Sequence, residues 1–118
     1  MRIPKVAHEI QRVVSELFQE GFDDPKLQLV SITRVIMSSD LKTAKLYIST
    51  FPDECMPDAL YAIHRMKGYF RSELADRTLL KYIPELIFFP DDGIKYSIDI
   101  ANRIEEIKRE LGYDTRGS

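Results

Sequence analysis

The sequence predicts one α+β domain in the order α-β-β-α-kink-α-β-α, with a three-stranded sheet whose helices pack on one face. Three segments repeat apolar residues at helical spacing, and three others are rich in β-branched and aromatic residues. A chain of 118 residues is long enough to build one core but too short for two domains of ordinary size.

Segment 4–20 is predicted to form the first helix. Its apolar residues follow one another at spacings of three, four and seven: Val6, Ile10, Val13, Val14, Leu17 and Phe18. Pro4 is acceptable in the first turn of a helix. Gly21 comes directly after the last apolar residue, where it favours the end of the helix.

Segments 28–37 and 43–51 are predicted to pair as an antiparallel hairpin, because a short linker of turn-forming residues joins them. Side chains alternate along the second strand: Ala44, Leu46 and Ile48 on one face, and Lys45, Tyr47 and Ser49 on the other. We expect the first face to pack on helices and the second to meet solvent or a partner.

Segment 59–82 favours helix throughout but places a lysine on its apolar stripe, which contains Leu60, Ile63, Phe70 and Leu74. Burying the unpaired ammonium of Lys67 would cost far more than a local bend, and Gly68 tolerates a bend. We therefore expect two helices joined at a kink around Lys67–Gly68, with Lys67 turned outward. The alternative is a straight helix in which Lys67 extends past the edge of the stripe into water.

Segment 85–89 is predicted to be the third strand, since Pro84 ends the preceding helical region. A last amphipathic helix is expected over 94–111, with Gly112 as its terminator. We interpret Asp91 and Asp92, between strand and helix, as turn and N-cap residues. Residues 113–118 are expected to form a short loose tail, so that the domain spans 1–112.

The distribution of charge predicts a local basic surface. The chain holds 17 basic and 19 acidic residues, a formal net charge of −2, which excludes a protein that is basic overall. Cations nevertheless outnumber acids in segments 34–50 and 59–84. A helix that starts just after Lys67–Gly68 would present backbone N–H groups beside these cations, an arrangement that binds phosphate. The alternative is an ordinary solvated helix face.

Catalytic motifs are missing from the sequence, which has no phosphate-binding loop, no GxGxxG and no GxSxG. One cysteine and two histidines argue against a disulfide framework and a zinc site. We expect a non-enzymatic protein without cofactor or metal; a metal-dependent enzyme using Asp91 and Asp92 is the weaker alternative. Because neither a membrane span nor a signal peptide is evident, we expect a soluble cytoplasmic protein.

Four segments of the chain resemble the bacterial ribosome-binding factor A family. They are KVAHEIQRVVSELF (5–18), DPKL (24–27), SSDLKTAKLYIST (38–50) and YIPELIFFPDD (82–92). The match covers roughly residues 4–107 in the expected order. The resemblance implies a KH-like domain of the second type, which agrees with the order of elements predicted above.

The resemblance also implies a function. Family members associate with the free 30S ribosomal subunit late in its assembly, near the decoding-site end of 16S rRNA, and aid rRNA processing and maturation, notably in the cold. Ribosomal proteins and assembly GTPases are further candidate partners. Ordinary KH domains hold RNA with a GXXG loop, which the family replaces by an Ala-X-Gly kink. The positions here are Met66, Lys67 and Gly68, so the glycine matches and the alanine does not.

The predicted RNA-binding residues are seven cations and one glycine: Lys42, Lys45, Arg65, Lys67, Gly68, Arg71, Arg77 and Lys81. The cations would contact rRNA phosphates, which positions a protein without reading sequence, and Gly68 would permit the bend that aligns them. We expect a monomer, because no broad exposed apolar patch is evident. The alternative function is a protein-interaction domain that uses the exposed strand face or an open sheet edge, with no nucleic-acid role.

Overall fold

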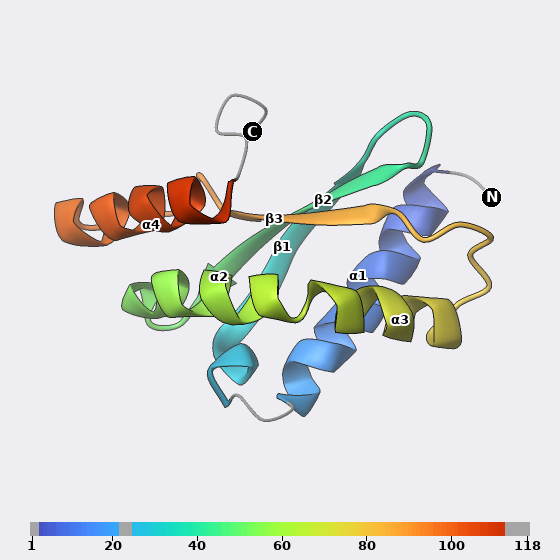
Figure 1. Ribbon diagram of the computed structural model, residues 1–118, viewed down its shortest axis with the longest axis horizontal. Coiled ribbons are helices and arrows are strands. Elements are labelled where there is room, and N and C mark those ends of the chain that lie inside the picture. Colours follow the sequence, from blue (N-terminus) through green and yellow to red (C-terminus); the bar gives the residue numbers. More distant parts are fainter. Residues whose placement is uncertain (1–2, 22–24, 113–118) are drawn as a thin grey trace.

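The computed structural model describes residues 3–21 and 25–112, and its elements follow the predicted order (Figure 1). They are α1 (Ile3–Glu20), β1 (Val30–Met37), β2 (Thr43–Thr50), α2 (Met56–Arg65), α3 (Lys67–Arg77), β3 (Glu85–Pro90) and α4 (Ile98–Leu111). Two short 3-10 helices, η1 (Pro25–Leu29) and η2 (Asp53–Cys55), precede β1 and α2. The predicted tail, 113–118, lies outside the described residues.

The sheet has the strand order β1-β2-β3. β1 and β2 pair antiparallel, which confirms the predicted hairpin, and β3 pairs parallel to β2. A parallel neighbour requires a crossover connection, which α2 and α3 provide. Ala44 lies beside Leu86 and Leu46 beside Phe88 in this register, so these four buried side chains project to the same face of the sheet.

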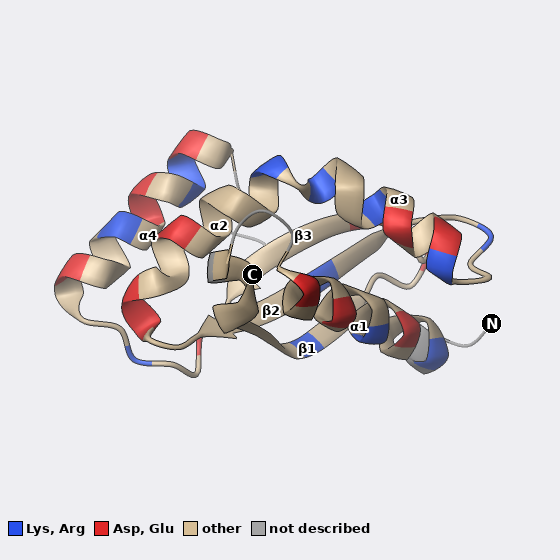
Figure 2. Ribbon diagram, turned by 90° about the horizontal axis from the view of Figure 1, so that it is seen from below, with Lys and Arg blue, Asp and Glu red and all other residues tan. Residues whose placement is uncertain are grey.

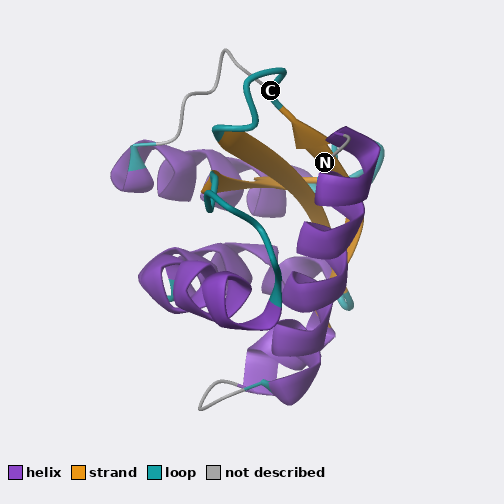
Figure 3. Ribbon diagram, turned by 90° about the vertical axis from the view of Figure 1, so that its right-hand side faces the viewer, coloured by secondary structure: helices purple, strands orange, loops and turns teal. Residues whose placement is uncertain are grey.

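Three phenylalanine rings join the helices to this face of the sheet. Phe18 of α1 meets Phe70 of α3 edge-on, with ring centroids 5.6 Å apart, and Phe70 lies 5.8 Å from Phe88 of β3. All three side chains are almost completely buried. α4 packs against α2 (Figures 1 and 3). The predicted α+β fold with helices on one face of the sheet is thus confirmed.

The expected break in the long helical region is confirmed, but it falls at Met66. Met66 has φ −102° and ψ 8°, outside the helical range, and separates α2 from α3. Its half-buried side chain packs against the core. Gly68 lies within the first turn of α3 at a negative φ, and a methyl group added there would meet nothing within 4 Å. The bend therefore does not need glycine at this position, contrary to the prediction.

Two helix boundaries were predicted wrongly. α3 ends at Arg77 rather than near residue 82, because Thr78 is extended and its hydroxyl donates to the carbonyl of Leu74 at 2.6 Å. Residues 78–84 instead return the chain to β2, where the amide of Glu85 donates to the carbonyl of Lys42. α4 begins at Ile98 rather than 94, and its N-cap is Ser97, not Asp92.

Candidate nucleic-acid interface

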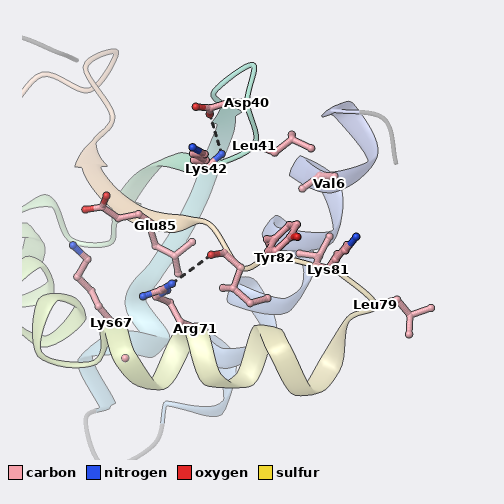
Figure 4. Close-up of a pocket in the computed structure, with 14 residues that line it drawn as sticks. Val6, Asp40, Leu41, Lys42, Lys67, Arg71, Leu79, Lys81, Tyr82 and Glu85 are labelled. Carbon is pink, nitrogen blue, oxygen red and sulfur yellow. Dashed lines mark hydrogen bonds between the residues drawn. The ribbon is translucent and has the colours of Figure 1, made fainter.

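A cavity of about 1140 Å³ lies between the β1–β2 turn, α3 and the connection 78–84 (Figure 4). Four of the seven predicted cations line it, together with the predicted glycine: Lys42, Lys67, Gly68, Arg71 and Lys81. These residues come from three separate parts of the chain. The fold therefore brings together most of the predicted site, which we call the basic cavity.

The β1–β2 turn supplies Lys42 to the basic cavity. The carboxylate of Asp40 accepts hydrogen bonds from the hydroxyl of Ser38 at 2.7 Å and from the backbone N–H of Lys42 at 3.0 Å. These two donors, the hydroxyl first, lower the pKa of Asp40. Leu41 between them adopts a positive φ of 62°, which is uncommon outside glycine. The turn is thus fixed by its own hydrogen bonds, and the carboxylate of Asp40 is engaged in them.

The start of α3 supplies Lys67, Gly68 and Arg71. Figure 4 shows Lys67 and Arg71 extending from the helix toward β3, so Lys67 is turned away from the core as expected. Among the residues that the structure describes, no side chain caps the N-terminus of α3. The partial positive charge of a helix N-terminus therefore adds to the charge of Lys67. This end of the cavity is suited to an anion such as a phosphate.

The connection 78–84 forms the remaining wall, which was not predicted because residues 78–82 were expected to continue the helix. Arg71 donates to the carbonyl of Ile83 at 3.4 Å, which ties the connection to α3. Leu79 and Tyr82 are 95% and 76% exposed. A signal for this end of the helix exists in the sequence: continuing the helical wheel from Leu60 puts Leu79 and Leu80 at ~100° and ~200°, off the apolar stripe.

Three predicted cations do not line the basic cavity: Lys45, Arg65 and Arg77. Lys45 projects from β2 to the opposite side of the sheet from Leu46. Arg65 ends α2, so it belongs with Lys67 and Arg71 in the run of cations from α2 into α3 (Figure 2). Arg77 lies outside the cavity at the far end of α3.

The guanidinium of Arg77 is surrounded by carboxylates. It lies 2.9 Å from Glu73 of its own helix and 3.1 Å and 3.6 Å from Glu20 and Glu16 of α1. The hydrogen bond to Glu20, followed by that to Glu73, raises the pKa of Arg77. Since three acids already balance its charge, Arg77 joins α1 to α3, and we leave it out of the proposed site. The net charge of a segment does not include carboxylates on another helix, so these partners on α1 could not be predicted from the sequence.

The second face of the sheet is not the open surface that alternation predicted. Tyr47 and Phe89 stack with ring centroids 5.7 Å apart and are only 5% and 3% exposed. The guanidinium of Arg34 lies 4.0 Å from the centroid of Tyr47 and 3.5 Å from the carboxylate of Asp92. The expectation that Tyr47 meets solvent or a partner was wrong, because neighbouring strands supply a ring and a cation that cover it.

The turn interpretation of Asp91 is confirmed. Its carboxylate accepts the N–H of Gly93 at 2.8 Å, and hydrogen bonds from Thr33, the larger cause, and Gly93 lower the pKa of Asp91. Within residues 3–21 and 25–112, no three His, Cys, Asp or Glu side chains gather as ligands for a metal ion. Over the same ranges, no helix has the length and apolar character needed to cross a membrane.

Comparison with known proteins gives concordant results. The family model described as Ribosome-binding factor A matches residues 2–107. A protein of Brevibacillus brevis named Ribosome-binding factor A is 38% identical over 111 residues, covering 93% of this chain and 88% of the relative.

Solved structures give the same family name. The crystal structure of ribosome-binding factor A from Thermus thermophilus superposes with a TM-score of 0.70 at 24% identity, covering 80% of this chain and 100% of that one. A homology model of the Thermus thermophilus factor, fitted into a cryo-electron-microscopy map of a complex with 30S, has a TM-score of 0.63 at 26% identity, covering 77% and 97%.

Proposed function

This chain belongs to the ribosome-binding factor A family, and we therefore propose that it binds the free 30S ribosomal subunit through 16S rRNA. It acts by binding rather than by chemistry, aids late rRNA processing and maturation, including in the cold, and works in the cytoplasm. The family name of its relatives and the fitting of the Thermus thermophilus factor into a map with 30S support this proposal.

The observation that carries the proposal is the concentration of cations at one cavity of a chain whose net charge is −2. Lys42, Lys67, Arg71 and Lys81 line it, and among the described residues that line it the acids are Asp40 and Glu85. The carboxylate of Asp40 is engaged by hydrogen bonds within its own turn, which leaves Glu85 as the acid that can compete for the cations. The uncapped start of α3 adds backbone N–H donors.

RNA phosphates are the anions that fit this arrangement, since several cations over one cavity match a run of phosphates along a strand. Such contacts fix the position of the domain and carry little sequence information. Specificity then comes from the folded shape of the rRNA. Occupying its site holds an immature conformation of the subunit and keeps it out of translation until the factor leaves.

The test is sedimentation of the protein with free small subunits on sucrose gradients at low and high salt. We expect co-sedimentation that weakens steeply as salt rises and that Arg71→Glu with Lys81→Glu abolishes. A matched control, Lys95→Glu with Arg103→Glu, changes the net charge equally at exposed positions outside the basic cavity and leaves binding intact. Circular dichroism checks that both variants fold.

Unchanged binding by the Arg71 and Lys81 variant would reject the basic cavity as the interface. Binding that resists ribonuclease and depends weakly on salt would instead favour the protein-interaction alternative.

A further inference from the structure

Two large apolar side chains are exposed beside the basic cavity. Leu79 is 95% exposed and Tyr82 is 76% exposed, and both line the cavity from the connection 78–84. Neither side chain buries enough surface to contribute much to the core. Exposed apolar groups that gather at a cavity indicate a binding role more often than isolated ones do.

The backbone of this connection is held at both ends, so its exposed side chains are presented from an anchored segment. Thr78 donates to the carbonyl of Leu74 and accepts from the N–H of Leu80 at 3.3 Å. Arg71 donates to Ile83 at 3.4 Å. Leu80 and Ile83 pack against the core. Binding through Tyr82 would therefore cost little ordering of the backbone.

Cations line the same cavity as Tyr82, where they can bind the phosphates that flank a base stacked on its ring. The ammonium of Lys81 is 5.6 Å from the centroid of the Tyr82 ring, and Figure 4 shows Lys67 and Arg71 on the α3 side of the same cavity. The cavity volume of about 1140 Å³ exceeds the usual range of small-molecule pockets, about 300–1,000 Å³. A base and its flanking phosphates can be held together there.

We propose that Tyr82 is a specificity-determining residue that stacks on the base of an unpaired nucleotide, so that the basic cavity selects single-stranded over double-stranded RNA. This inference rests on the RNA-binding function proposed above. Every base has an aromatic face, but a paired base in a duplex has none free to stack on a side chain. An apolar peptide is the rival occupant, and it gives no reason for four cations around the same cavity.

The absence of tryptophan from the sequence allows a direct test. Tyr82→Trp provides a single fluorescent reporter at the proposed stacking position. The control is Phe51→Trp. Phe51 is 83% exposed and follows the last residue of β2, whereas Lys42, which lines the cavity, precedes the first residue of β2. The probe is a single-stranded RNA of about ten nucleotides without self-complementarity, compared with its own duplex and with an abasic strand of the same length.

We expect the single strand to quench the fluorescence of Tyr82→Trp and to leave that of Phe51→Trp unchanged. Binding measured by anisotropy should weaken about tenfold or more in Tyr82→Ala and remain near the wild-type value in Tyr82→Phe, which keeps the ring. The abasic strand should bind wild type and Tyr82→Ala equally, because it offers phosphates without bases.

Equal affinity of wild type and Tyr82→Ala for the base-containing strand would overturn the inference, as would failure of the wild type to bind that strand. Tighter binding of the duplex would also overturn it. The proposed function is judged separately by sedimentation with small subunits. If Tyr82→Ala and wild type co-sediment equally while the Arg71 and Lys81 variant does not, only the stacking inference fails.

Discussion

The number of cations in the basic cavity sets the expected salt dependence of RNA binding. Each phosphate of a single strand that a cation neutralises contributes about −0.7 to the slope of log affinity against log salt. Four contacts, from Lys42, Lys67, Arg71 and Lys81, give a slope of about −2.8. Raising the salt from about 50 to about 200 mM should then weaken binding about 50-fold.

Replacing one of these cations by glutamine removes one contact and should reduce the slope to about −2.1, or about 20-fold weakening over the same salt range. Arg77→Gln is the control, because its guanidinium is balanced by three carboxylates outside the cavity. The assay is anisotropy of the labelled single-stranded RNA at a series of salt concentrations. The reasoning is refuted if the four single variants keep the wild-type slope or if Arg77→Gln reduces it as they do.

Three further predictions concern the fold around the site. Gly68→Ala should not lower thermal stability, because the added methyl meets nothing within 4 Å, but it should weaken RNA binding by projecting into the basic cavity; unchanged affinity would show that RNA does not approach this backbone. Phe70→Ala should lower the free energy of unfolding by about 3–5 kcal/mol, measured by urea denaturation, because its ring is fully buried between Phe18 and Phe88; a loss below about 1 kcal/mol would contradict this packing. Tyr96→Phe should raise the free energy of unfolding by about 1 kcal/mol at neutral pH, because the buried hydroxyl has no hydrogen-bond partner among the described residues. Burial, the largest cause, raises the pKa of Tyr96 from 10.0 to about 12. The neutral form therefore favours the folded state below pH 10, and this contribution to stability is lost between pH 10 and 12. If the free energy of unfolding of the wild type does not fall relative to that of Tyr96→Phe over this range, the shift is contradicted.

The helix break shows how much of the site can be predicted from the sequence. The position of Lys67 on an apolar stripe was enough to predict a break nearby, because burying an unpaired charge is costly whatever the fold. The residue that carries the bend could not be identified in this way. Met66 adopts the non-helical conformation, and its side chain packs on the core. Whether there is space for this side chain depends on the elements that pack around it.

The basic residues show what could not be predicted from the sequence. Lys42 and Lys81 are far apart in the sequence yet line one cavity, whereas Arg77, only four residues from Lys81, is balanced by Glu16 and Glu20 of α1. Summing charge by segment treats all three alike. Whether a cation binds a ligand or an internal carboxylate depends on which elements pack beside it.

The number and order of the α-helices and strands, the antiparallel hairpin and the family follow from the sequence, because periodicity, turn residues and motifs are local properties of the chain. Only the packed structure shows that the connection 78–84 forms a wall of the basic cavity and that Tyr47 is covered rather than open. Both outcomes depend on contacts between segments distant in the chain. Such contacts arise only once the strands have paired and the helices have packed, so no local pattern records them.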